Sequence, residues 1–383
     1  MRVAPRSPHP VTTPAPLGRY RIAPVAAPRA PRFKALLAWG SRVLRFARAE
    51  LKSVDLSLSV ADRWRALRLG FSATSYVLYQ LATRDSRDFV SDFDVRLRSD
   101  RVNGLFNAIV RNKLVFARTM ALHGFHHPRV HAWLDRGQVH DLEARKPAES
   151  AGEWLARLQP GERRVLKPVA EGQGQGIIFL CRTAQGFALN DVAVALDEVA
   201  ALLSELRRYL ITDFAVQAPY AAALYPETTN TVRVLTLWDL ALSRPFIAAA
   251  SQRVGSSRSA PVDNFHSGRG GLSARIDVET GRLGPGATLS GAGQLSWHER
   301  HPESGAPIAG VRVEGWEELA ASVLAAAARL PEAPAIGWDL VMTEAGCCFL
   351  EGNTPPGLSV WQVHGPLLAD PRARRFYEAH GVI

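Results

Sequence analysis

The 383-residue sequence has only three cysteines and no long apolar run, and each absence excludes a class of protein. So few cysteines, without CxxC spacing, argue against a disulfide framework or a cysteine zinc site and fit a reducing compartment. No apolar run approaches the roughly 18 residues that a membrane-spanning helix needs. The N-terminus also lacks the compact apolar region of a signal peptide. We therefore expect a cytoplasmic protein without a transmembrane segment.

Acidic residues are scarce at the N-terminus, where the net charge of the chain is concentrated. Residues 1–50 contain ten basic residues and one acidic residue, so they carry most of the formal net charge of +10. The rest is nearly neutral and has no basic stripe interleaved with aromatics, which argues against nucleic-acid binding. Residues 1–32 are rich in Pro, Ala and Arg and have little to bury. We expect them to form a disordered basic tail.

Residues 33–110 are predicted to be mostly helical. Within 33–51, leucines recur every seven residues beside a row of arginines, which indicates a basic amphipathic helix. Its apolar side either packs on the body of the protein or makes weak contact with an anionic membrane surface. A second helix is expected over 61–81.

From residue 111 onward the pattern mixes helices and strands without strict alternation, which favours the α+β class over a doubly wound sheet. The expected helices cover 113–122, 191–209 and 316–330. Extended segments are expected at 128–133, 164–168, 177–181, 214–217, 231–238 and 246–254.

A predicted hairpin near the C-terminus carries the most informative polar residues. We expect Gly346 to end a three-residue loop, which pairs Thr343 with Cys347. Asp339 then lies opposite Glu351. Because side chains alternate along a strand, Asn353 and Phe349 are expected on the same face of the hairpin as Asp339 and Glu351. Leu350 is expected on the opposite, apolar face.

Two carboxylates and a carboxamide on one sheet face form a cluster of hard oxygen ligands. Such a cluster suits Mg²⁺, which takes one or two carboxylates and completes its shell with substrate phosphates. The alternative is a solvated polar face. Carboxylates directly opposite each other destabilise a sheet, so the metal interpretation of Asp339, Glu351 and Asn353 is favoured.

A glycine-rich loop follows the strand that ends near Lys167. Gly172, Gly174 and Gly176 alternate with glutamines, and without side chains there the backbone N–H groups can approach a polyanion. The loop matches neither the Walker A nor the Rossmann pattern. Alone it could equally be a flexible turn, but combined with a Mg²⁺ site it indicates nucleotide chemistry.

Two arginines lie on otherwise apolar strands. Arg233 is flanked by valines, and Arg253 lies near the end of the 246–254 strand, before a polar loop that contains Asn264. Such an arginine either pairs with a buried acid or faces an anionic ligand.

The segment Glu351-Gly352-Asn353-Thr354-Pro355-Pro356-Gly357, with Asp339 on the neighbouring strand, resembles the metal segment of the ATP-grasp superfamily. The phrases Asn230-Thr231-Val232-Arg233, Val262-Asp263-Asn264 and Ile336-Gly337-Trp338-Asp339 resemble one branch, the sugar-transfer-associated proteins related to α-L-glutamate ligases. The resemblance implies two α+β subdomains, over 111–220 and 221–383, that clasp a nucleotide.

The resemblance also implies roles for individual residues. ATP phosphates would be held by Lys113, Lys167 and the loop of Gly172, Gly174 and Gly176. The metal, Mg²⁺ or Mn²⁺, would be bound by Asp339, Glu351 and Asn353. Gln217 and Ala218 occupy the place of the adenine hinge, where most members have a carboxylate. Catalysis would fall to Arg253, Arg233 and Asn264.

The implied activity is an ATP-dependent carboxylate–amine or carboxylate–thiol ligase that forms an acyl phosphate and acts in cell-surface polysaccharide or sugar-transfer pathways. Its partners would be a small-molecule carboxylate and an amine. Two alternatives stay open at this point: a kinase of a small hydroxyl substrate, and a nucleotide-binding regulatory or scaffold protein.

Overall fold

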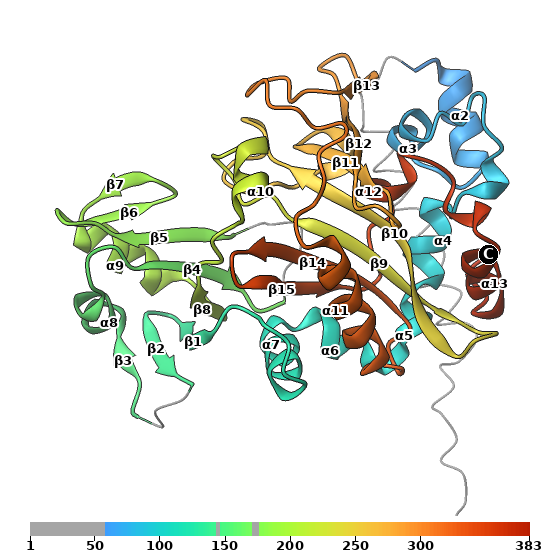
Figure 1. Ribbon diagram of the computed structural model, residues 1–383. Helices are drawn as coiled ribbons and strands as arrows, with labels where there is room; N and C mark the ends of the chain where they lie inside the picture. Colours follow the sequence, from blue (N-terminus) through green and yellow to red (C-terminus); the bar gives the residue numbers. More distant parts are fainter. Residues whose placement is uncertain (1–57, 143–145, 171–175) are drawn as a thin grey trace, which may run out of the picture. The chain divides into compact units, whose positions relative to one another are not determined.

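The computed structural model describes residues 58–142, 146–170 and 176–383 (Figure 1). The predicted basic tail, the predicted helix over 33–51, and Gly172 and Gly174 of the glycine-rich loop lie outside these residues. Within them the strands form two sheets in which every neighbouring pair is antiparallel. Helices precede and separate these strands, which confirms the α+β class.

The first sheet has the strand order β3-β2-β1-β8-β4-β5-β6-β7. Its strands are β1 (Val130–Asp135), β2 (Gln138–Asp141), β3 (Glu149–Ser150), β4 (Arg163–Pro168), β5 (Ile178–Arg182), β6 (Phe187–Leu189), β7 (Val192–Val194) and β8 (Tyr209–Asp213). Helices α8 (Ala151–Arg157) and α9 (Leu196–Glu205) share a hydrophobic core with it. The predicted helix over 191–209 was too long at both ends, because residues 192–194 pair with β6 as a strand and α9 ends at Glu205.

The second sheet has the order β13-β12-β11-β10-β9-β14-β15. Its strands are β9 (Val232–Asp239), β10 (Arg244–Val254), β11 (Leu272–Ile276), β12 (Leu283–Leu289), β13 (Leu295–His298), β14 (Ala335–Thr343) and β15 (Gly346–Asn353).

Both faces of the second sheet are covered, and each face has its own core. Helix α11 (Trp316–Ala328) contacts β9, β10, β14 and β15, and packs with Val232, Val234 and Trp338. On the other face Leu235 and Leu237 pack with residues of α2, α3 and α13. Residues that alternate along one strand therefore enter different cores, and Arg233 points to the side of the second core.

Short helices make up most of the segment before the first strand. They are α2 (Val60–Arg68), α3 (Ala73–Leu78), α4 (Asp92–Arg98), α5 (Asp100–Asn103), α6 (Asn107–Arg111) and α7 (Lys113–Leu122), with the 3₁₀ turns Ser86–Asp88 and Gly104–Phe106. The helix predicted over 61–81 is broken, because Gly70 has a φ of +82° and Ser72 caps a new helix by accepting a hydrogen bond from the Ser75 N–H. The prediction for α7 matches the structure.

The later helices are α10 (Pro219–Leu224), α12 (Ser359–Gln362) and α13 (Pro371–Ala379), with the 3₁₀ turns His266–Gly268 (η4) and Leu367–Ala369. The strand predicted over 214–217 was wrong: β8 ends at Asp213, and Ala218 already caps α10.

The hairpin of β14 and β15 has a different register from the predicted one near its turn. Thr343 pairs with Gly346, so the loop holds two residues instead of three. An irregularity between Asp339 and Leu340 admits one extra residue, Leu350, on β15. The two differences cancel, and Asp339 pairs with Glu351 as expected. Phe349, predicted on the polar face, instead pairs with Leu340 in the core.

Gly352 lies between two predicted metal ligands and has no room for a side chain. A Cβ there would be 2.6 Å from Val110 Cγ1 and 3.0 Å from Phe116 Cε2. We expect Gly352→Ala to lower the free energy of unfolding by about 1–3 kcal/mol, measured by urea denaturation.

The matched control is Gly152→Ala in α8, where an added Cβ meets no atom within 4 Å. Alanine there favours the helix, so the stability of this variant should be unchanged or slightly raised. Equal urea midpoints for both variants would contradict the packing argument.

Candidate active site

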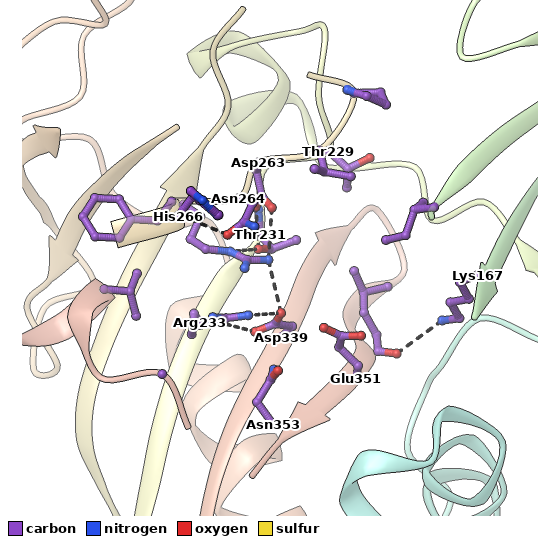
Figure 2. A pocket seen from close by; sticks show the side chains of 18 of the residues that line it. Lys167, Thr229, Thr231, Arg233, Asp263, Asn264, His266, Asp339, Glu351 and Asn353 are labelled. Carbon is purple, nitrogen blue, oxygen red and sulfur yellow. Dashed lines mark hydrogen bonds and ion pairs between the residues drawn. The ribbon is translucent and has the colours of Figure 1, made fainter. Parts of the chain in front are cut away.

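A cavity of about 800 Å³ lies where the two sheets and the N-terminal helical segment meet (Figure 2). Strands β4, β5 and β8 of the first sheet contribute one part of its wall, and β9, β10, β14 and β15 contribute another. Seven of the predicted site residues, all with charged or amide side chains, line it: Lys167, Arg233, Arg253, Asn264, Asp339, Glu351 and Asn353. Residues that are up to 186 positions apart in the sequence therefore share one space.

Asp339 is at the centre of this group. Its side chain is almost fully buried, and it accepts a hydrogen bond of 2.6 Å from Arg233 Nε and a second from the same guanidinium. Arg253 Nη2 lies 3.2 Å from Asp339 Oδ2. Burial raises the pKa of Asp339, but the charges of Arg233 and Arg253 outweigh burial and lower the pKa to about 2. Asp339 is therefore ionised at neutral pH.

The oxygen atoms of Asp339, Glu351 and Asn353 fit a hard cation. The first two residues are a cross-strand pair, and Asn353 is two residues further along β15, on the same cavity wall. Two carboxylates and an amide match the donors that Mg²⁺ takes alongside phosphate oxygens. An ion at Asp339 would share that carboxylate with two guanidinium groups. Among the described residues, no cluster of three or more His, Cys, Asp or Glu side chains offers an alternative site.

Both predicted phosphate lysines approach the same hairpin. Lys167 Nζ is 3.4 Å from the carbonyl oxygen of Leu350, the bulge residue. Leu350 was predicted to lie in the core, but it lines the cavity. Lys113 Nζ is 3.3 Å from Glu351 Oε2, and its side chain is buried. Burial lowers the pKa of Lys167 to about 8, although the negative charge of Glu351 acts in the opposite direction.

A second acid holds Arg253 in place. Asp263 Oδ1 lies 3.0 Å from Arg253 Nη2, while its other oxygen accepts hydrogen bonds from the N–H and hydroxyl of Thr231. Arg253 Nε in turn donates to Thr231 Oγ1 at 2.8 Å. Every one of these side chains is buried. The guanidinium therefore has a fixed orientation at the cavity wall, next to Asn264. The sequence analysis named Asp263 and Thr231 within the family phrases but gave them no role, since polar residues near a loop carry no signal of burial.

Gln217 and Ala218, predicted at the adenine hinge, are not among the residues that line the cavity. The Gln217 side chain donates to the Thr228 carbonyl and accepts from the Asn230 N–H. Ala218 is buried, and its N–H donates to the Met342 carbonyl. These contacts hold both residues at the start of α10, and the hinge role predicted for them stays a prediction.

The wall next to β8 is instead formed by Asp213, Phe214 and Ala215. Asp213 is a carboxylate at the end of β8, on this wall. Its Oδ1 lies 2.6 Å from His131 Nε2 and 3.6 Å from Arg164. Sequence reasoning did not single out Asp213, because the strand predicted over 214–217 hid the fact that β8 ends at this acid.

These features fit the ATP-grasp class that the motifs resemble. Residues 96–376 match the family described as sugar-transfer associated ATP-grasp, so the chain belongs to this family, which confirms the resemblance. No curated protein matches the chain.

Several solved structures are similar to the chain. N5-carboxyaminoimidazole ribonucleotide synthetase, solved with ADP, is 12% identical over 70% of this chain and 52% of its own, with a TM-score of 0.40. The D-alanine–D-alanine ligase from Coxiella burnetii is 12% identical over 72% of this chain and 59% of its own, with a TM-score of 0.37. The VanG D-Ala:D-Ser ligase from Enterococcus faecalis is 14% identical over 71% of this chain and 63% of its own, with a TM-score of 0.39. The chain thus spans less than two thirds of the length of each.

The low pKa of Lys167 predicts a pH dependence of nucleotide binding. The lysine is mostly charged at pH 7 and loses its charge as the pH rises through about 8. Because phosphates bind the charged form, we expect the Kd for Mg-ADP to rise between pH 7.5 and 9.5, by up to about tenfold per pH unit above 8.

Calorimetric titration across this range would test the prediction. Lys167→Arg is the matched variant, because a guanidinium stays charged and its profile should be flat. A wild-type affinity that does not change with pH would show that Lys167 does not contact the phosphates.

Proposed function

We propose that the chain is an ATP-dependent ligase that joins a carboxylate to an amine, or to a thiol, through an acyl phosphate. The observation that carries the proposal is that one cavity is lined by a lysine, an oxygen cluster and a fixed guanidinium. These are Lys167, the cluster of Asp339, Glu351 and Asn353, and Arg253. Phosphoryl transfer needs this combination, since its catalysis is mainly positioning and charge neutralisation.

The reaction would occur in two steps. A carboxylate oxygen of the first substrate attacks the γ-phosphorus of ATP, the bond to the β-phosphate oxygen breaks, and ADP leaves. The amine nitrogen then attacks the acyl carbon, phosphate departs, and the nitrogen loses a proton. Closing the site against water matters, because water would otherwise hydrolyse the acyl phosphate.

The residues would divide this work. Lys167 and Lys113 bind the phosphates. Mg²⁺, or Mn²⁺, held by the oxygen cluster would neutralise charge on the phosphates. Arg253 would orient the carboxylate against the γ-phosphoryl group, with Arg233 and Asn264 beside it. A planar guanidinium suits this task because it can hold two oxygens at once.

The family description supports a place in sugar transfer, such as the assembly of cell-surface polysaccharide. We propose small-molecule carboxylate and amine substrates and a cytoplasmic reaction, where ATP is available and the three free cysteines stay reduced. No helix in the described part of the chain could cross a membrane.

An ADP-release screen tests the proposal. Purified full-length protein is given Mg-ATP together with amino acids, amino sugars and sugar acids, and products are identified by mass spectrometry. An amide or thioester formed in proportion to ADP supports a ligase. A phosphorylated product without condensation would instead indicate a kinase.

Replacing one oxygen ligand should stop turnover without unfolding the protein. Glu351→Gln removes a charge that serves the metal and Lys113, so we expect turnover to fall below detection while the circular dichroism spectrum is unchanged. Glu344→Gln, at the exposed turn of the same hairpin, is the control and should keep full activity. Normal turnover by Glu351→Gln would rule out its role as a metal ligand.

Two basic residues should give different kinetic defects. Lys167→Ala should raise the KM for ATP. Arg253→Lys should lower kcat on the order of a hundredfold, because the transferring group depends on this guanidinium mainly in the transition state. Steady-state kinetics with both variants would separate these roles. If Arg253→Lys bound ATP poorly and turned over normally, Arg233 would become the better candidate.

A further inference from the structure

Arg233, Asp339 and Glu351 form a row across three neighbouring strands. In the register of the second sheet, Asp339 of β14 pairs with Arg233 of β9 on one side and with Glu351 of β15 on the other. Directly opposite residues have their Cβ atoms about 4.5–5.5 Å apart. Figure 2 shows the three side chains next to one another in this order. Asp339 can therefore pair with the cationic side chain on β9 or share a metal ion with the acid on β15.

The Arg233 guanidinium holds both oxygens of Asp339. Its Nε donates to Oδ1 at 2.6 Å and its Nη2 donates to Oδ2, which Arg253 Nη2 also contacts at 3.2 Å. A carboxylate oxygen has two lone pairs, so Oδ2 is fully engaged and Oδ1 has one position left, beside the guanidinium. Two parallel, charge-assisted hydrogen bonds are among the strongest that a side chain makes. A divalent cation that binds Asp339 must therefore compete with Arg233.

The two arginines at Asp339 differ in what else holds them. Arg253 has further partners in Asp263, at 3.0 Å, and in Thr231 Oγ1, at 2.8 Å. Within the described part of the chain, the guanidinium of Arg233 is hydrogen-bonded to Asp339 alone. The side chain of Arg233 is 15% exposed and lines the cavity. Arg233 is thus the arginine that can change partner when an anion enters.

The ion pairs around the oxygen cluster are balanced in charge. Three cationic side chains meet three carboxylates: Lys113, Arg233 and Arg253 with Asp263, Asp339 and Glu351. A divalent ion that arrived alone would add positive charge to a partly buried site whose ion pairs are already neutral, which is unfavourable. A nucleotide brings negative phosphates, and these can match both the ion and a released guanidinium.

We propose that Arg233 is a gate for the metal ion: it holds Asp339 until a nucleotide phosphate takes over its guanidinium, and the divalent ion binds Asp339 together with the nucleotide and not before it. The exchange replaces the two Arg233–Asp339 hydrogen bonds with bonds from the same N–H groups to phosphate oxygens. Arg233 is a positioning residue in this scheme, distinct from Arg253, which stays on Asp263. The inference rests on the proposed function, because it requires that the cavity binds a metal–nucleotide complex.

Binding of Mn²⁺ alone tests the gate with the full-length protein. Mn²⁺ takes the same oxygen ligands as Mg²⁺, and its free form can be counted by electron paramagnetic resonance. Without nucleotide, we expect Arg233→Gln to bind Mn²⁺ about tenfold or more tightly than wild type, because the ion no longer competes with charge-assisted hydrogen bonds. Arg233→Lys keeps the charge but loses the planar fork, so its affinity should lie between these two.

Arg253→Gln is the matched variant, and circular dichroism checks the fold of each protein. This variant removes the same charge from Asp339 but leaves both bonds of Arg233 in place. Its affinity for Mn²⁺ should therefore rise by less than about threefold. Arg244→Gln changes an exposed arginine outside the cavity, controls for net charge and should behave like wild type.

Repeating the titrations with ADP measures how strongly the nucleotide and the ion assist each other. In wild type we expect ADP to tighten Mn²⁺ binding, and in Arg233→Gln this effect should shrink by about tenfold, because Asp339 is then available without nucleotide.

The gate is refuted if Arg233→Gln binds Mn²⁺ alone no more tightly than wild type, if Arg253→Gln gains as much, or if ADP assists Mn²⁺ equally in wild type and Arg233→Gln. If Arg233→Gln did not fold, the same comparisons would be decided by Arg233→Lys. A wild type that binds no Mn-ADP would overturn the proposed function and the gate with it. Normal Mn-ADP binding without the expected gain would overturn the gate alone.

Discussion

The site depends on a group of four charges, of which three are buried and one, Arg233, is partly exposed. Asp339 and Asp263 face Arg233 and Arg253 on the polar side of the second sheet, and each acid contacts at least one arginine. Taking such charges out of water costs several kcal/mol per ion unless each is matched and hydrogen-bonded. Here two negative charges balance two positive charges. The pairing makes a polar wall tolerable in a sheet that has a hydrophobic core on each face.

This balance also explains how the two sheets share one site. Arg233, Arg253 and Asp339 lie on strands of the second sheet, and Asp263 lies on the loop between β10 and β11. Lys167 comes from the first sheet and Lys113 from α7. Both lysines reach β15, one at a carbonyl oxygen and one at a carboxylate. Bound phosphates would thus sit between cations supplied by one part of the fold and acids supplied by the other. A shift of either sheet would therefore change the distances between the lysines and the oxygen atoms of β15.

Sequence patterns predicted the elements whose residues alternate or repeat clearly. Helix α7 was predicted with its observed ends, and the facing of Asp339 and Glu351 followed from strand pairing. The bulge at Leu350 was not predictable, because nothing in local composition distinguishes an extra residue from a longer loop. The end of β8 was misjudged for a similar reason: Phe214 and Val216 have strand propensity, yet the chain leaves the sheet at Asp213.

The roles of the loop residues around the cavity depend on contacts that no local pattern carries. Thr231 and Asp263 are 32 positions apart, and only the folded chain brings the acid to the hydroxyl. The same is true of the helical segment, whose serines read as ordinary helix caps. The periodicity of apolar residues indicates which face of a helix or strand is buried. It does not indicate which residues from other parts of the chain contact that face.

The bulge has a consequence for how this hairpin can vary. On the loop side of Leu350, residues of β14 and β15 pair at one offset, and on the site side they pair at another. The two halves are thus out of phase by one residue, and a single insertion or deletion in the turn would have to be absorbed there to keep the acids facing. Transplanting the site into another scaffold would therefore require the continuous stretch from Asp339 to Asn353, since neither strand alone encodes the alignment.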